Sequence, residues 1–213
     1  MQVFKGILLT GGVGNDSNIY IIDNEMIVDA GTGAFFPVIK ENLENSGFNL
    51  KGIKTIINTH CHFDHTGGDR KFRDLCKAKI MIHKSDSKAL ETGKGTIADL
   101  FNEVPKTTTI DKALKGGEKI QTKNFSWEVL STPGHTPGSI CLYEPKKRIL
   151  ISGDTLFSDG IGRTDLPGGS HKALKDSLKK LSQMKIDYLF PGHGMPKMSG
   201  VDFYIKQTLT KLK

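Results

Sequence analysis

The chain has 213 residues, of which 37% are hydrophobic and 25% charged, the balance of a globular protein that buries a substantial core. No apolar run reaches the roughly 18 residues that a membrane span requires, and the first residues lack the apolar stretch and cleavage site of a secretory signal. Three dispersed cysteines do not make a disulfide framework, so we expect reduced thiols and a cytoplasmic protein.

The net charge of +7 does not by itself predict a nucleic-acid partner. The 26 lysines and four arginines are spread along the chain, and the longest basic run is the three residues 146–148. A nucleic-acid interface would cluster its charges and favour arginine, because the guanidinium group contacts phosphate through two hydrogen bonds. We therefore expect a solvated, lysine-rich surface, with neither a nucleic-acid nor a membrane partner.

The first half of the chain predicts an antiparallel meander followed by alternating strands and helices. Short β-branched segments separated by Gly- and Asn-rich turns predict the meander, and apolar residues at helical spacing predict the helices. The expected strands are 6–10, 18–23, 26–29, 53–58 and 79–83, and the expected helices are 35–43, 69–76 and 85–90. Residues 92–117 show neither pattern, and we expect a loop-rich segment over the functional site.

The second half predicts another group of strands and two helices. The expected strands are 119–122, 125–131, 139–143, 148–152 and 188–190. A helix over 171–181 follows the N-cap candidate Ser170, and a last helix places Ile205, Leu209 and Leu212 on one face. Two groups of strands with helices between them favour two sheets packed face to face, with helices outside each. We expect one domain over residues 1–213.

The segment Thr59–His65 carries the strongest chemical signal. His60 and His62 lie two residues apart after a predicted strand, so an extended backbone directs both imidazoles to the same side. Asp64 and His65 follow at once, which completes a His-x-His-x-Asp-His block. Imidazole and carboxylate groups are the ligands of zinc, iron and manganese. The block therefore predicts half of a site for two metal ions.

Three further candidates each follow a predicted strand: His135 in a Thr-Pro-Gly-His turn, Asp154 in Ser-Gly-Asp, and His193 in Pro-Gly-His-Gly. Strand ends meet at one rim of a sandwich, and Gly/Pro turns hold a side chain there rigidly. We interpret Asp64 and Asp154 as catalytic carboxylates, because a water shared by two cations loses a proton near neutral pH. The predicted ligands are His60, His62 and His135 for one metal, Asp64, His65 and His193 for the other, with Asp154 bridging both.

These residues resemble the metallo-β-lactamase superfamily over nearly the whole chain, from the opening meander to the final histidine. The resemblance implies an αββα sandwich of two mixed β-sheets flanked by helices. Residues 153–157 and 162–169 look like the glyoxalase II, or hydroxyacylglutathione hydrolase, group, whose members hydrolyse thioesters. Only about twenty residues follow His193, so the chain is similar to a short branch without the C-terminal helical domain. Two-zinc β-lactamases typically carry Cys at the position of Asp154, so the resemblance does not imply antibiotic hydrolysis.

The resemblance implies a dinuclear-metal hydrolase in which a metal-bridging hydroxide cleaves a small-molecule thioester. Two divalent ions are expected per chain, zinc in the first place and iron or manganese as alternatives. A persulfide dioxygenase of the same superfamily also fits, with one iron at the positions of His60, His135 and Asp154. An RNA-processing nuclease would use the net charge, yet residues 84–123 hold 8 lysines against 6 acidic residues, without the basic arm of such nucleases.

Arg163 lies in a Gly-rich loop nine residues beyond Asp154, and its role has two interpretations. It either binds a carboxylate of the substrate or forms an ion pair with Asp165 that shapes the loop. Asp29 is expected to shape a turn near the metal rim rather than to bind metal. The remaining residues interpreted as non-ligands are Cys61, His83 and His171.

Overall fold

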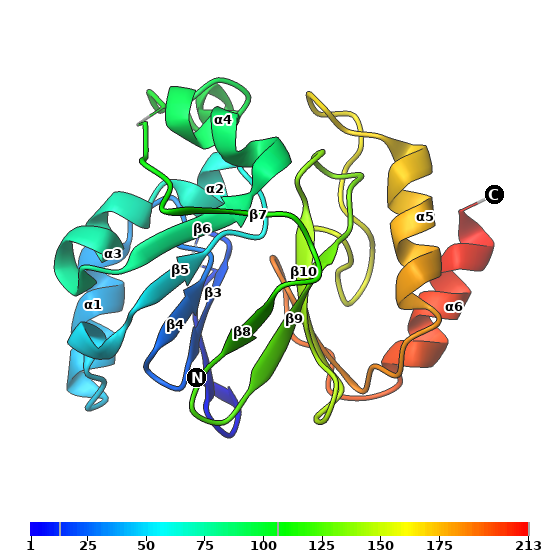
Figure 1. The fold of residues 1–213 in the computed structure, drawn as a ribbon, viewed down its shortest axis with the longest axis horizontal. Coiled ribbons are helices and arrows are strands. Elements are labelled where there is room, and N and C mark those ends of the chain that lie inside the picture. The colour runs from blue at the N-terminus through cyan, green and yellow to red at the C-terminus, as the bar shows by residue number, and fades with distance from the viewer. Residues whose placement is uncertain (13, 106, 213) are drawn as a thin grey trace.

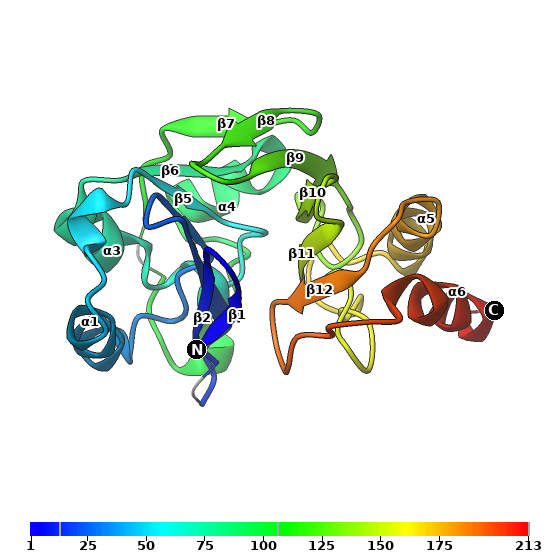
Figure 2. The same ribbon diagram turned by 90° about the horizontal axis from the view of Figure 1, so that it is seen from below.

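Two β-sheets pack face to face, and helices cover the outer face of each sheet (Figures 1 and 2). The computed structural model describes residues 1–12, 14–105 and 107–212. Both sheets contain parallel as well as antiparallel pairs. The αββα sandwich with two mixed sheets is therefore confirmed.

The first sheet has seven strands that lie in chain order. Neighbours are antiparallel from β1 to β4 and parallel from β4 to β7. The parallel half places the carboxyl end of β5 at an edge of the sheet, and the His-x-His-x-Asp-His block begins there. The strands are β1 (Gln2–Phe4), β2 (Ile7–Gly11), β3 (Asn18–Ile22), β4 (Met26–Val28), β5 (Thr55–Ile57), β6 (Lys79–His83) and β7 (Lys112–Leu114).

The second sheet has five strands in the order β12-β11-β10-β9-β8. All its neighbours are antiparallel except β11 and β12, which run parallel. The turns after β9, β11 and β12 carry the other three predicted ligands. The strands are β8 (Lys119–Gln121), β9 (Ser126–Ser131), β10 (Ile140–Glu144), β11 (Ile149–Gly153) and β12 (Tyr188–Pro191).

The alternation of side chains along each strand divides the core into layers. In β3 all five residues are buried, but Tyr20 and Ile22 face the second sheet while Ile19 and Ile21 face the helices. Such a strand is apolar on both faces, because each face meets another layer. Trp127 of β9 is fully buried between the two sheets.

Helices form the outer layers. Helices α1 (Phe36–Asn45) and α3 (Asp69–Cys76) cover the first sheet, and α5 (His171–Leu181) and α6 (Val201–Lys211) cover the second. The predicted N-cap of α5 is confirmed, because the hydroxyl of Ser170 accepts a hydrogen bond from Ala173 N at 3.3 Å. In the described part of the chain, none of the helices has the length and apolar character needed to cross a bilayer.

The structure contains several short elements that the sequence did not predict. Strands β1 and β7 have three residues each and lie at sheet edges, too short to show an alternating pattern. The ligand block turns through the short helix α2 (Phe63–Thr66), and Leu50–Gly52 forms a 3₁₀ helix, η1. Helix α4 (Lys84–Thr92) is longer than expected, and the ambiguous segment after it contains a second 3₁₀ helix, η2 (Ala98–Phe101). Lys106, in the same segment, lies outside the described residues.

The packing of α5 on the second sheet can be tested through Leu178, which is fully buried between them. We expect Leu178→Ala to lower the free energy of unfolding by about 2–5 kcal/mol, since it leaves a cavity in the layer. Lys172→Ala on the exposed side of the same helix should change it by less than about 0.5 kcal/mol. Urea denaturation measures both, and equal effects of the two substitutions would contradict the packing of this helix.

Candidate metal centre

The seven predicted ligand residues lie together at one rim of the sandwich, in the turns that follow strands of both sheets. The block from His60 to His65 follows β5 of the first sheet, while His135, Asp154 and His193 follow β9, β11 and β12 of the second. Five of them line a cavity of about 450 Å³, namely His62, Asp64, His135, Asp154 and His193. The sequence thus predicted the meeting point of four chain segments, although their role as ligands stays a prediction.

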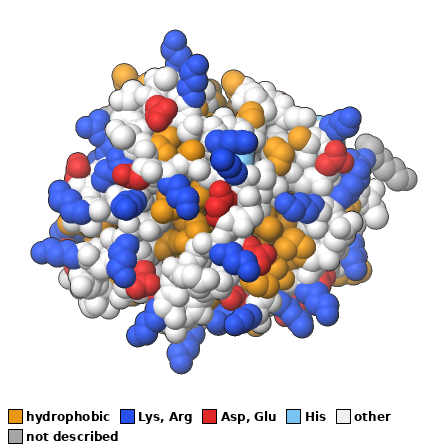
Figure 3. All heavy atoms as spheres, in the orientation of Figure 1, with side chains coloured by type: hydrophobic (Ala, Val, Ile, Leu, Met, Phe, Trp, Pro, Cys, Tyr) orange, Lys and Arg blue, Asp and Glu red, His pale blue; other side chains and the backbone are white. Residues whose placement is uncertain are grey.

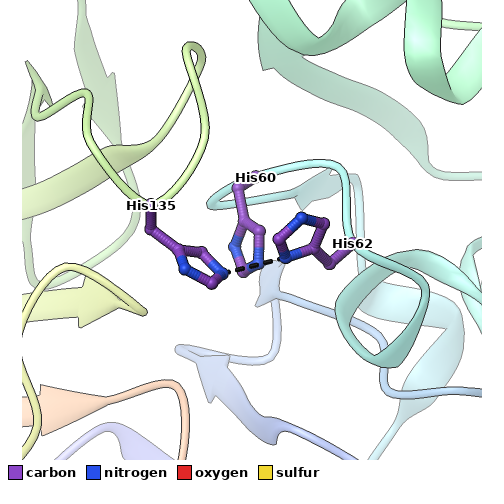
Figure 4. Close-up of side chains that lie close together, drawn as sticks. All are labelled: His60, His62 and His135. Carbon is purple, nitrogen blue, oxygen red and sulfur yellow. Dashed lines mark hydrogen bonds between the residues drawn. The ribbon is translucent and has the colours of Figure 1, made fainter. Parts of the chain in front are cut away.

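Three imidazoles form the first cluster, which consists of His60, His62 and His135. One ring nitrogen of each lies within 4.8 Å of one ring nitrogen of the other two. The rings point toward one another, with His62 Nδ1 and His135 Nε2 only 2.9 Å apart (Figure 4). Two of these residues come from the first sheet and one from the second, so the cluster joins the two halves of the fold.

The second cluster consists of Asp64, His65 and His193, whose candidate ligand atoms also lie within 4.8 Å of one another. His193 Nε2 is 2.9 Å from Asp64 Oδ2 and 3.3 Å from His65 Nε2. This cluster again takes two residues from the first sheet and one from the second. His193 is the most accessible of the three, with 37% of its side chain exposed, so the cavity is open on this side.

Asp154 lies between the two clusters. Its Oδ1 is 3.2 Å from His65 Nε2, while its Oδ2 is 3.5 Å from His135 Nε2 and 3.7 Å from His193 Nε2. The carboxylate therefore reaches both clusters at once, as a bridging ligand must. A glycine at position 192 is required beside it, because a Cβ there would collide with Asp154 Oδ1.

Burial and mutual repulsion favour the neutral form of two imidazoles in the first cluster, those of His60 and His62. Burial lowers the pKa of His60 well below its usual value, and the neighbouring histidines lower it further. Burial and His135 together lower the pKa of His62 to about 3. A neutral imidazole offers the lone pair that a metal ion requires, so these rings need lose no proton before they bind one.

Neighbouring histidines keep the carboxyl group of Asp154 in its charged form. Burial alone would raise the pKa of this carboxyl group, but His65, His193 and His135 reverse the effect and hold it well below the usual range. For His65, burial lowers the pKa and the carboxylates of Asp154, Asp29 and Asp64 raise it, with a net rise. An ionised carboxylate is thus present between the clusters at neutral pH.

The donor atoms of the site fit divalent cations. Within the seven predicted ligands, His60 Nε2, His62 Nε2 and Asp154 Oδ1 are buried without a hydrogen-bond partner, although His65 Nε2 lies 3.2 Å from Asp154 Oδ1. A buried polar atom without a partner costs about 1–3 kcal/mol, a penalty that metal coordination would remove. Mixed imidazole and carboxylate ligands suit zinc, iron or manganese. The residues present therefore fit a divalent metal, but they do not discriminate among these ions.

Hydrogen bonds at the far side of three rings orient the histidines. His65 Nδ1 lies 2.8 Å from Asp29 Oδ2, and His135 Nδ1 lies 2.7 Å from the carbonyl oxygen of Arg163. His60 Nδ1 lies 3.1 Å from the hydroxyl of Thr59, which itself donates to Asp29. A proton on each Nδ1 satisfies these acceptors and directs the Nε2 lone pair into the site. Asp29 thus shapes the rim, and it belongs to neither cluster.

Asp86 of α4 connects the two loops that carry the first cluster, a role that no sequence pattern indicated. The side chain is buried, with Oδ2 accepting from Cys61 N at 3.0 Å and from the Thr136 hydroxyl at 2.7 Å. Its Oδ1 accepts from Gly138 N at 2.7 Å. In the sequence, Asp86 looks like any acidic residue in the first turn of a helix. The structure shows that it holds the His60–His62 and His135 loops in register.

Two residues of β3 fix the loop that carries His193. The amide of Asn18 donates to the carbonyl oxygens of Pro191 at 3.0 Å and Gly194 at 2.8 Å. The Tyr20 hydroxyl donates to the same Pro191 oxygen at 2.8 Å. Both residues lie in a strand that is apolar in pattern, so their contact with a loop of the other sheet could not be predicted.

Arg163 forms the ion pair with Asp165 that was one of its two interpretations, and Cys61 lies in the core. The Arg163 guanidinium is exposed and forms two contacts with Asp165, Nε to Oδ1 at 3.0 Å and Nη2 to Oδ2 at 2.7 Å. Arg163 also lines the cavity above the metal ligands, so the ion pair leaves a substrate contact open as a prediction. Cys61 is buried among apolar residues, and burial raises the pKa of its thiol, which fits core packing.

Comparison with known proteins agrees with this geometry. Residues 12–193 match the family model described as the metallo-beta-lactamase superfamily. A probable metallo-hydrolase of Methanocaldococcus jannaschii, MJ0888, is 37% identical over 203 residues, which cover 88% of this chain and 92% of that protein. The hydroxyacylglutathione hydrolase GloC of Haemophilus influenzae is 32% identical over 179 residues, or 80% of each protein.

Solved structures of the same fold include two whose descriptions bear on the site. The B3 metallo-beta-lactamase BLEG-1 superposes with a TM-score of 0.79 at 28% identity and covers 96% of both chains. TTHA1623, crystallised in a di-iron-bound form, superposes with a TM-score of 0.77 at 26% identity, over 92% of this chain and 96% of the other. The second of these structures holds two iron ions, which keeps iron among the candidate metals.

The first prediction from this geometry concerns Asp86. In Asp86→Asn the amide group must turn an N–H toward one of three donors, so the loops of the first cluster lose their alignment. We expect a loss of about 10–100-fold in zinc affinity, the scale found when groups that orient ligands are replaced. Competition with a chromogenic chelator measures the affinity. Asp74→Asn on the exposed side of α3 is the control, and wild-type affinity in a folded Asp86→Asn protein would contradict the positioning role.

A second prediction concerns Asp154 and the number of metal ions. Seven ligands with one shared carboxylate predict two metal ions per chain under saturating metal, as measured by elemental analysis. Asp154→Ala removes a ligand from both positions and should lower the hydrolytic rate more than about 10³-fold. His171→Ala, on the exposed start of α5, should stay within about tenfold of the wild-type rate. A firm value of one metal per chain would contradict the bridging role.

Proposed function

Because the chain belongs to the metallo-β-lactamase superfamily, we propose that it is a dinuclear-metal hydrolase that cleaves thioesters of the hydroxyacylglutathione type. The observation that carries the proposal is the pair of clusters on either side of Asp154, each with three candidate ligand atoms within 4.8 Å. Zinc is the first candidate for both positions, and iron or manganese would use the same ligands.

The protein contributes binding and orientation to such a reaction. When bound, two divalent cations would lower the pKa of a shared water and polarise a carbonyl group, so no Ser or Cys nucleophile is needed. Asp154 and Asp64 supply the negative charge that retains the cations, while Asp29 holds the His65 ring in one orientation. Phe157 and Leu166 line the cavity and reduce the access of bulk water to the reacting carbonyl.

Thioester hydrolysis is supported by sequence and by the wall of the cavity. Residues 153–157 and 162–169 resemble the glyoxalase II group, and the relative GloC is described as a hydroxyacylglutathione hydrolase. Arg163, from the second of these segments, offers a cation beside the metal ligands. Its ion pair with Asp165 is exposed and contributes little, so a substrate carboxylate can replace Asp165 at low cost.

The charge distribution supports a small-molecule substrate rather than a nucleic acid. On the face drawn in Figure 3, Lys and Arg side chains are scattered and Asp and Glu side chains lie among them. A nucleic-acid interface would need a continuous basic surface along the path of the phosphates. We keep the cytoplasm as the proposed location, because Cys61, Cys76 and Cys141 are free thiols, as expected in a reducing compartment.

Two other reactions have a specific observation in their favour. A mononuclear-iron persulfide dioxygenase would use His60, His135 and Asp154, which lie close together here as well. β-Lactam hydrolysis is suggested by the likeness to BLEG-1. The carboxylate of Asp154 supports the thioesterase over the β-lactamase, because two-zinc β-lactamases typically carry Cys at this position. The second cluster supports the thioesterase over the dioxygenase, because a mononuclear site would not use it.

The reaction class is tested by a panel of substrates under controlled oxygen. We expect the zinc-loaded protein to release thiol from S-lactoylglutathione or simpler thioesters without oxygen, and the iron-loaded protein to do so at a rate within about tenfold. Oxygen plays no part in attack on a carbonyl, so removing it should leave the rate unchanged. Thiol release is followed with a chromogenic disulfide, and oxygen uptake with an electrode.

The same panel contains the results that would contradict the proposal. Glutathione persulfide should cause no oxygen uptake, and a chromogenic cephalosporin should remain intact. Oxygen uptake by the iron form, with no thiol release from any thioester by the zinc form, would establish the dioxygenase instead. Rapid cleavage of the cephalosporin without thioester cleavage would establish the β-lactamase.

A further inference from the structure

One wall of the metal cavity is apolar and is formed by a segment that contributes no metal ligand. Ile97, Leu100 and Phe101, at and around η2, line this wall. Leu100 is 60% exposed, although a leucine of a globular protein is usually buried. An apolar side chain that borders a functional cavity and faces solvent is available to contact a ligand.

The backbone of this wall is held in a strained conformation. Ile97 has a φ of 55°, and Asn102 at the other end of η2 has a φ of 54°. Isoleucine is β-branched and avoids the left-handed region, so the surroundings must enforce the conformation. Phe63 provides this support, because its N–H donates to the Thr96 carbonyl at 2.8 Å and its ring packs 5.7 Å from the Phe101 ring.

A second cavity of about 240 Å³ borders the metal cavity at this wall, where Phe101 lines both. Asn15 and Phe101 line both cavities, so the two are neighbours that share a boundary. The second cavity, which we call the side lobe, is lined by aromatic rings and small side chains. Its lining includes Phe35, Phe63 and Ala34.

The charges around the two cavities are distributed unevenly. Among the described lining residues, Arg163 is the one Lys or Arg side chain, and it lines the metal cavity but not the side lobe. The side lobe contains one charged residue in its described lining, Glu103. An anionic group is therefore favoured beside Arg163 and disfavoured in the side lobe. A neutral, apolar group fits the side lobe.

We propose that the side lobe binds an apolar acyl group of the substrate, while the thiol part of the substrate lies toward Arg163. The inference rests on the proposed thioesterase function and specifies its substrate class. In the reaction, water adds to the acyl carbon, the carbon–sulfur bond breaks, and the acyl group leaves as a carboxylate while the sulfur leaves as a thiol. The carboxylate product then has its charged end at the metal ligands and its apolar chain in the side lobe.

The size of the side lobe sets the size of the acyl group. A buried apolar cavity of about 150 Å³ is large enough for benzene. At about 240 Å³, the side lobe accommodates a phenyl ring or a short aliphatic chain. A lactoyl or acetyl group would leave most of the side lobe unfilled, so we expect larger acyl groups to bind more tightly.

Binding of carboxylate products tests the inference without relying on turnover. Acetate, butyrate, hexanoate and phenylacetate are titrated into zinc-loaded protein by calorimetry. We expect the affinity to rise about fourfold for each methylene that enters the side lobe, since each buried methylene contributes a constant increment. Phenylacetate should bind at least as tightly as hexanoate.

Variants at Ala34 locate the effect in the side lobe. Ala34 is exposed and lines the side lobe, so Ala34→Trp fills it from the solvent side. In Ala34→Trp the affinity should no longer rise from acetate to hexanoate, and the milder Ala34→Leu should give an intermediate slope. Val38→Trp, on the exposed side of α1 and outside the lobe, is the matched control and should retain the wild-type series. Zinc content and circular dichroism confirm that each variant is folded.

The outcomes separate the inference from the proposed function. Equal affinity for all four carboxylates, or the same rise in Ala34→Trp and Ala34→Leu as in the wild type, would overturn the side lobe as the acyl site. Thioester hydrolysis could still stand in that case, with a preference for small acyl groups. A steep series that flattens in both variants, in a protein that hydrolyses no thioester, would support the side lobe and reject the proposed function.

Discussion

The structure depends on one buried carboxylate, Asp154, which lies between two groups of ligand side chains from opposite sheets. Burial disfavours its charge, and the histidines around it restore the charged form. This balance requires positive or metal-bound partners on both sides, because a lone buried carboxylate would instead take up a proton. The turns after β5, β9, β11 and β12 bring those partners to one rim of the sandwich.

Because each cluster takes residues from both sheets, metal binding and the packing of the sheets are coupled. The apolar layer between the sheets aligns their strand ends, and Asp86, Asn18 and Tyr20 then connect loops across the rim through directed hydrogen bonds. Metal ions that bind the aligned ligands would stabilise the folded state by the free energy of binding. Burial lowers the pKa of His60 and His62, so metal binding requires little proton release from these two imidazoles at neutral pH.

The sequence predicted the layers and the seven residues at the rim, but not the contacts that hold them. His60, Asp154 and the other candidates were recognisable because ligand chemistry and Gly/Pro turns coincide with strand ends. Asp86 and Asn18 act through partners 25 to 176 residues away, and such contacts leave no local pattern. Strand β7 and the helix η2 were missed because they are three and four residues long. The side lobe arises from segments that are far apart in the chain, so no local sequence pattern predicts it.

Anomalous diffraction from crystals grown with saturating zinc would test the central claim most directly, because it locates the ions independently of activity. Data collected on both sides of the zinc edge should show two peaks at the rim. One peak is expected within about 2.0–2.2 Å of the first cluster and the other at the same distance from the second, with one oxygen of Asp154 bound to each. A single peak, or two peaks that Asp154 does not join, would contradict the dinuclear centre.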